Sequence, residues 1–278
     1  MRNPVFVFLP LHWKLLNQGR KKRDVSKDRE YMDADPLIED SVREEDTKDS
    51  SDEPLLALTK YVFDRGERPV TRGLFHQIAA ILSIVTGSVL STYAWMELVW
   101  WQALGVTIYA LAMLGLFSVS AAYHRGPWRR LHTVAWWRRA DHSTIAVFIA
   151  ATYTPLCLIV LELRTALWML GIAWVGAIAS VIMNMVWINH PRWLGVLVYL
   201  VLGWLIVPLI PQLWSGAGHT VVWLLFAGGI IYSVGALVYG FKWPGRNAKW
   251  MGYHEHFHLA TIIAAIVHLV AVWMVVVN

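Results

Sequence analysis

The sequence predicts an all-α membrane protein, a seven-transmembrane-helix bundle with its N-terminus in the cytoplasm and its C-terminus outside. Its apolar content of 57% exceeds the roughly 45–50% of soluble domains. After Leu74 the chain has only four acidic residues, which are Glu97, Asp141, Glu162 and Glu255. A soluble core cannot bury so many apolar side chains with so few charges, so lipid must be the solvent.

Residues 1–58 are predicted to form a disordered, charged cytoplasmic tail. They contain 10 of the 24 Lys and Arg residues and 13 of the 19 Asp and Glu residues. The stretch from Lys21 to Glu53 is also poor in aromatic residues, so it cannot bury enough apolar surface to fold alone. We therefore expect two parts, the tail and a membrane domain over residues 59–278.

Apolar runs begin after Arg72, and each is near the roughly 20 residues that a spanning helix needs. Turn-rich or charged breaks separate most of them, such as Gly126-Pro127 and His190-Pro191. The expected spans are 74–94, 98–124, 141–161, 166–188, 193–213, 219–241 and 254–277.

The loop charges predict the orientation. With these spans, 13 Lys and Arg residues fall on the side of the N-terminus and only Arg164 falls on the other. Basic loops stay in the cytoplasm, so the N-terminus is expected there. Because these basic residues lie in short loops that orient the protein in the membrane, the net charge of +5 does not indicate a nucleic-acid partner. Membrane lipids are the expected partners. The single cysteine, Cys157, excludes an intramolecular disulfide and a Cys-rich zinc site.

Polar residues that the predicted topology brings to one depth form the candidate site. Such residues are costly in a bilayer and are therefore functional candidates. Ser120 and His124 end the second span at the cytoplasmic face. Asp141 and His142 are expected to begin the third span there, and His254 to His258 begin the seventh.

Three of these histidines predict a zinc site. His254 and His258 are four residues apart, so they project from one helix face, and His124 can supply a third nitrogen. Three protein ligands and one water are usual for a catalytic zinc, which lowers the pKa of that water to about 7. Asp141 is then the candidate general base, with Ser120 orienting it or a ligand.

Other interpretations stay open for the remaining polar residues. His254 to His258 also fits the H-E-x-x-H pattern of zinc proteases, in which Glu255 would be the base. Glu255 also has a simpler interpretation, because an acidic side chain in the first turn of a helix interacts favourably with the helix dipole. His256 projects from a different helix face than His254 and His258. His268 is expected about 15 Å deeper in the membrane than His258, where it would form a hydrogen bond within the protein or contact the substrate. His190 is expected to be hydrated at the interface.

Four motifs together resemble the haemolysin III family, the bacterial members of the progestin-and-adipoQ-receptor group that includes the adiponectin receptors. They cover about residues 60–278. In chain order they are Arg68 to His76, Ser120 to His124, Ala140 to Ser143 with Ala151 to Pro155, and Tyr253 to His258 with His268.

The resemblance implies a seven-helix, multi-pass protein of a bacterial inner or plasma membrane. It also implies zinc held by His124, His254 and His258, with Asp141 close to the metal-bound water. The superfamily includes ceramidases and other lipid hydrolases, and a pore-forming activity has been ascribed to the family. His256 departs from the family pattern, because an apolar residue is usual there, and residues 1–58 lie outside it.

We therefore expect a zinc-dependent hydrolase of lipid amide or ester bonds. The alternatives are a pore-forming, cytolytic protein with structural zinc, an intramembrane protease, and a receptor-like sensor.

Overall fold

The computed structural model describes residues 71–278 except 129, 188 and 244–250. The expected tail over residues 1–58 and the domain boundary after it lie outside the described residues. Within the described part every regular element is a helix, which confirms the all-α prediction.

The seven expected membrane helices are present. By length and composition, seven described segments can cross a membrane. Large apolar side chains such as Val186 and Trp100 are 80% and 67% exposed, as lipid-facing residues should be. The crossings are α4 (Leu74–Glu97), α5 (Trp100–Arg125), α6 (Leu131–Val160), α7 (Leu163–Val186), a fifth made of several pieces, α10 (His219–Gly240) and α11 (Tyr253–Val277).

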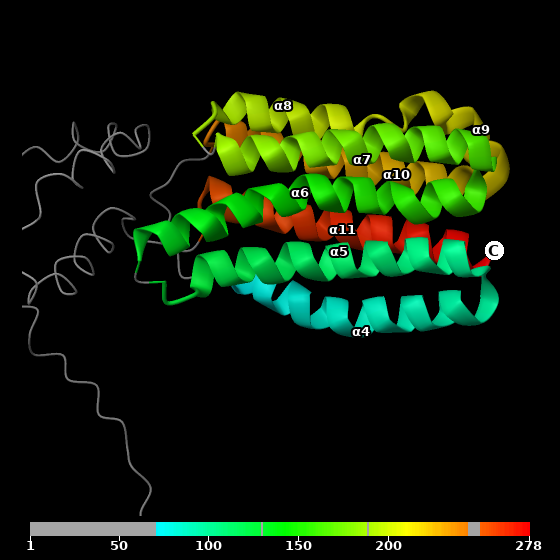
Figure 1. Cartoon of the computed structure of the whole chain (residues 1–278), viewed down its shortest axis with the longest axis horizontal. Coiled ribbons are helices and arrows are strands. Elements are labelled where there is room, and N and C mark those ends of the chain that lie inside the picture. Colours follow the sequence, from blue (N-terminus) through cyan, green and yellow to red (C-terminus); the bar gives the residue numbers. More distant parts are fainter. Residues whose placement is uncertain (1–70, 129, 188, 244–250) are drawn as a thin grey trace, which may run out of the picture. The chain divides into compact units, whose positions relative to one another are not determined.

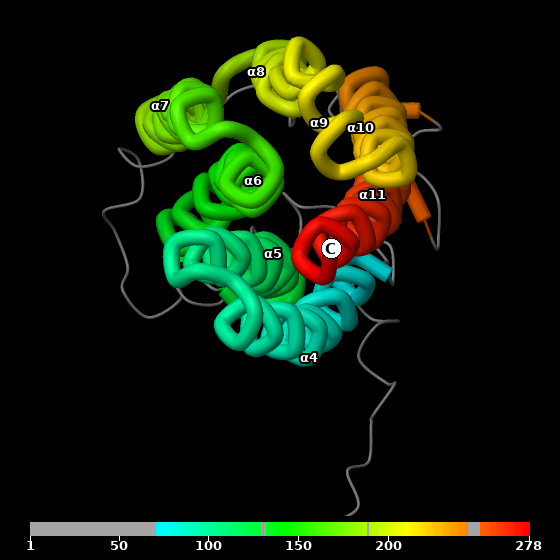
Figure 2. The backbone as a smooth tube through the Cα atoms, turned by 90° about the vertical axis from the view of Figure 1, so that its right-hand side faces the viewer, coloured from blue at the N-terminus to red at the C-terminus, as the bar shows by residue number. Residues whose placement is uncertain are grey.

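Successive helices pack side by side and complete a closed bundle (Figures 1 and 2). Viewed end-on, the chain passes around the bundle from α4 to α10, and α11 returns to lie beside α4. In addition to α10 and α4, α11 contacts α6. This closure brings the start of α11 to the same end of the bundle as the end of α5 and the start of α4.

The third crossing corrects one boundary. Helix α6 begins at Leu131, ten residues before the expected start at 141, so Asp141 and His142 lie about three turns inside it. Residues 131–140 contain no Gly or Pro to end a helix. The apolar run marks only the part of a helix that lipid surrounds, so it misses this polar extension.

The fifth crossing, expected as one run over 193–213, is a broken helix. It consists of α8 (Arg192–Gly203), the 3₁₀ turn η1 (Val207–Leu209) and α9 (Ile210–Ala217). Pro208 and Pro211 lack backbone N–H groups, which weakens helical pairing here. The Tyr153 hydroxyl of α6 lies 2.6 Å from the carbonyl oxygens of both Leu202 and Gly203. A neighbouring side chain thus satisfies carbonyls near the break, as lipid cannot.

A glycine sets the spacing of the helix that carries two of the site histidines. A Cβ built on Gly235 of α10 would lie 2.6 Å from the Cβ of Ala260 in α11. Small residues let membrane helices approach closely, so α11 sits where it does because position 235 has no side chain.

Gly235→Ala is expected to destabilise the bundle by about 1–3 kcal/mol, the usual cost of overpacking. Thermal unfolding of the detergent-solubilised protein measures this. Gly171→Ala in α7 is the matched control, because nothing lies within 4 Å of a Cβ there. Equal melting temperatures for the two variants would contradict the assigned contact.

Candidate metal centre

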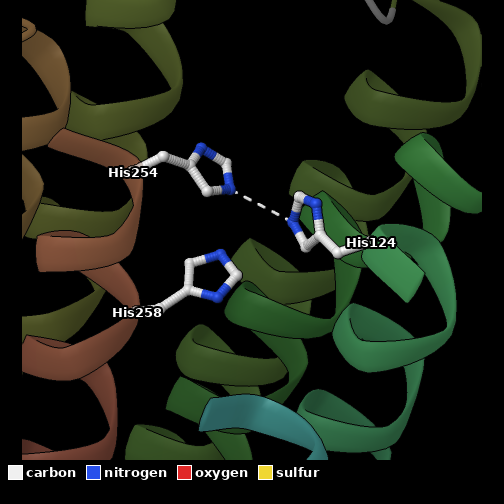
Figure 3. A group of neighbouring side chains, drawn as sticks. All are labelled: His124, His254 and His258. Atoms are coloured by element: carbon white, nitrogen blue, oxygen red, sulfur yellow. Dashed lines mark hydrogen bonds between the residues drawn. The ribbon is translucent and has the colours of Figure 1, made fainter. Parts of the chain in front are cut away.

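Three histidines from two helices converge at one end of the bundle (Figure 3). His124 lies in the last turn of α5, and His254 and His258 lie in the first two turns of α11. One ring nitrogen from each lies within 4.8 Å of the other two. The structure therefore brings together the three residues that the sequence predicts as ligands.

One pair of these nitrogens already has the spacing of two ligands on a zinc-like ion. The Nε2 atoms of His124 and His254 are 3.1 Å apart. Two nitrogens bound tetrahedrally to zinc at about 2.0–2.1 Å would be about 3.3 Å apart. His124 and His258 are also buried, so few solvent molecules compete with an ion for their nitrogens. The group can therefore hold a metal ion, while the identity of that ion as zinc stays a prediction.

A buried carboxylate lies beside the histidines. Oδ2 of Asp141 in α6 is 3.8 Å from Nε2 of His124, which is too long for a hydrogen bond. Ser120, one turn before His124 in α5, is buried and lies close to the Asp141 side chain. Because α6 starts early, Asp141 lies inside the helix and not at its end. Its side chain nevertheless lies beside the three histidines. Its catalytic role stays a prediction.

Glu255 has structural partners instead. Its carboxylate accepts a hydrogen bond from the Nε–H group of Arg72 and another, at 2.8 Å, from the backbone N–H of Gly252. The side chain is 2% exposed. It thus caps the first turn of α11 and forms an ion pair across the bundle, which favours the helix-terminus interpretation over a role as general base.

The residues just before α4 join the two helices that supply the histidines. Gly73 has φ of 75°, and a Cβ on it would lie 2.7 Å from the Cβ of His124. The adjacent Arg72 pairs with Glu255 of α11. Residues 72 and 73 therefore contact α5 through a glycine and α11 through an ion pair. Neither contact could be read from spacing along the sequence.

A fourth histidine, to which the sequence analysis assigned no role, lies beside the three candidate ligands. His76, in the first turn of α4, is 3% exposed, and its ring stacks on that of His258 with centroids 3.9 Å apart. His76 ends the first family motif, so its type and position were visible, but only the packing of α4 against α11 reveals the contact.

The other histidines lie outside the cluster. Nδ1 of His256 is 2.7 Å from the Gly252 carbonyl oxygen, and His268 donates to the Leu225 carbonyl at 3.2 Å. For His268 this agrees with the hydrogen-bonded interpretation.

A polar network between α6, α7 and α8 was not predicted. The Tyr199 hydroxyl donates to the backbone carbonyl of His142 at 2.9 Å and accepts from the Asn184 amide at 3.4 Å. His190 Nε2 lies 3.0 Å from the Asn184 Oδ1 atom, so this histidine is more than a hydrated interfacial residue. Asn184, an amide inside an apolar run, was the signal available in the sequence.

The purified protein is expected to contain one equivalent of metal that His124→Ala removes. Losing a ligand should weaken binding by more than the roughly 10–100-fold that loss of an outer partner costs. Elemental analysis per chain measures it, and His132→Ala, at an exposed histidine, is the control. Equal metal content in both variants would exclude His124 as a ligand.

Comparison with known proteins gives the family. Residues 65–269, which include every residue of the centre, match the family model described as Haemolysin-III related. The chain is 32% identical to "Hemolysin-3 homolog" of Bacillus subtilis (strain 168) over 185 residues, 65% of this chain and 84% of the relative. It is also 32% identical to "Hemolysin-3" of Bacillus cereus over 203 residues, 71% of this chain and 88% of the relative.

A more distant relative extends the comparison to the receptor group. Human "Monocyte to macrophage differentiation factor" is 27% identical over 182 residues, 62% of this chain and 71% of the relative. This match supports the expected link to the progestin and adipoQ receptor superfamily. The family match spans most of the chain and agrees with the seven apolar helices. The chain therefore belongs to the haemolysin-III related family of multi-pass membrane proteins.

Proposed function

We propose that this protein is a zinc-dependent membrane hydrolase that cleaves amide or ester bonds of lipids. The observation that carries the proposal is the convergence of three histidine nitrogens next to the Asp141 carboxylate at one end of an apolar bundle. The basic loops predict that this end faces the cytoplasm.

His124, His254 and His258 would hold the ion through one nitrogen each. Zinc bound by three protein ligands polarises a carbonyl group and lowers the pKa of water in its open position. The protein contributes a preorganised set of neutral nitrogen donors, two of them buried and the third, from His254, partly buried. It also contributes an acid of its own close by, which a purely structural zinc site does not need.

Asp141 is the residue placed to move the proton. As general base it takes a proton from the attacking water, whose oxygen bonds to the lipid carbonyl carbon. The carbon–nitrogen or carbon–oxygen bond then breaks, and Asp141 returns the proton to the leaving amine or alcohol. Ser120 is a positioning residue, because its contact with Asp141 holds the carboxylate toward His124.

The position of the centre suits a lipid substrate. The histidines lie at the ends of helices that present large apolar side chains outward. Amide and ester groups of lipids lie at the boundary between headgroups and hydrocarbon, about 15 Å from the bilayer midplane. A reacting carbonyl can therefore meet the histidines while its acyl chain stays in apolar surroundings, which makes membrane lipids the expected partners.

Asp141→Asn and Glu255→Gln separate the two candidate bases. Asp141→Asn is expected to lower kcat by about 10²–10⁴-fold, the contribution of a general base. Glu255→Gln keeps a neutral acceptor for Gly252 but weakens the ion pair with Arg72, so it should lower thermal stability with little loss of kcat. Turnover of a fluorescent N-acyl lipid amide by the two folded variants measures kcat, and thermal unfolding measures their stability. The reverse ranking would favour the protease-like assignment of Glu255.

Metal removal tests the reaction class. In liposomes containing the amide lipid or its ester analogue, a zinc chelator should abolish turnover, and added zinc should restore it. His254→Ala should stay inactive after zinc is added, whereas the control His132→Ala should recover. Hydrolysis that survives both the chelator and His254→Ala would rule out this mechanism.

A further inference from the structure

His76 has buried polar atoms whose protein partners are incomplete. The residue is 3% exposed, and neither ring nitrogen forms a hydrogen bond of normal geometry with any residue that the structure describes. One nitrogen approaches the backbone carbonyl of His258. A single carbonyl oxygen can satisfy only one of the two nitrogens, so at least one stays without a protein partner.

An incomplete partner set at this position is costly. A buried polar group without a hydrogen bond costs about 1–3 kcal/mol, and a histidine in the first turn of a membrane helix could instead have been apolar. The ring also makes an edge-on contact with Phe117, with centroids 5.2 Å apart, which offers no hydrogen-bonding atom to a ring nitrogen. A polar molecule at the metal centre would supply the missing hydrogen bond.

The stacking geometry excludes His76 as a direct ligand of the same ion. The His76 and His258 rings are inclined by 15° with centroids 3.9 Å apart. A metal bound to His258 lies in the plane of that ring at about 2.0–2.1 Å from its nitrogen. Stacked carbon atoms stay about 3.5 Å apart, so a His76 nitrogen remains about 3 Å or more from that plane. That distance is too long for coordination but is suitable for a hydrogen bond.

We propose that His76 is a substrate-positioning residue. It hydrogen-bonds to the water or the lipid carbonyl group that occupies the open position between His124, His254 and His258. This proposal rests on the proposed function and deepens it, because it assigns α4, which supplies no ligand, a direct role in holding the reacting group. The ion pair of Arg72 with Glu255 and the contact of Gly73 with His124 fix the start of α4 for that role.

Cobalt substitution with a hydroxamate probe tests the proposal without relying on turnover. Co²⁺ replaces zinc in histidine sites and gives a visible absorption band. Acetohydroxamate is a small anion that binds an open metal position and accepts hydrogen bonds. Titration of the Co²⁺-loaded, detergent-solubilised protein with acetohydroxamate, followed at that band, gives a Kd for the open position.

His76→Phe is the discriminating variant, because it keeps a ring to stack on His258 but removes both nitrogens. It should retain one equivalent of Co²⁺ and raise the Kd for acetohydroxamate about tenfold or more, as expected for loss of a hydrogen bond to a charged group. His76→Leu should do the same, and it carries the test if the larger phenyl ring prevents folding. His76→Gln, which restores an amide donor and acceptor, should recover most of the affinity.

Two results would overturn the proposal. Loss of the Co²⁺ equivalent in folded His76→Phe or His76→Leu would make His76 a ligand. An unchanged acetohydroxamate Kd in those variants would reduce its role to packing. Neither result affects the proposed function, which fails separately if the wild-type protein binds no metal or hydrolyses no lipid.

Discussion

The centre depends on the meeting of the end of α5 with the start of α11. His124 faces His254 across this contact, and two other features hold the helices in place. Gly235 lets α10 bring α11 close, and the segment before α4 connects both helices through Gly73 and Arg72. A chain in lipid can place polar side chains only where other protein groups or bound molecules satisfy them. The polar residues of four helices therefore gather at one end of the bundle.

The two acids near the histidines show how environment separates chemical roles. Both Asp141 and Glu255 are buried, and either could act as a base on residue type alone. Glu255 is engaged by a guanidinium group and a backbone N–H group, so its charge is paired and each of its oxygens already accepts a hydrogen bond. The Asp141 carboxylate has a serine hydroxyl nearby and faces His124. The difference in partners is what directs the proposed proton transfer to Asp141.

Much of the fold could be predicted because lipid imposes strong constraints on sequence. Apolar runs located all seven crossings, and spacing by four residues placed His254 and His258 on one face. The predicted helix boundaries and continuity were wrong where the polarity of the sequence does not correspond to the ends or breaks of helices. Helix α6 continues through a polar stretch before 141, and the crossing that begins at Arg192 is broken near its prolines, where Tyr153 bonds to carbonyls of a different helix. Both features depend on local backbone pairing and on neighbours, which hydropathy does not measure.

The sequence by itself determined the seven-helix class, the expected orientation and the three candidate histidines, because apolar runs, loop charges, spacing along one helix and predicted depth in the membrane indicate them. Only the tertiary structure decided which acid lies beside His124 and which is paired with Arg72, that Arg72 and Gly73 link α5 to α11, and that His76 stacks on His258. The contacts of Arg72, Gly73 and His76 join residues more than 50 positions apart. Their geometry depends on how closely and at what rotation the helices pack, which no local pattern of residues specifies.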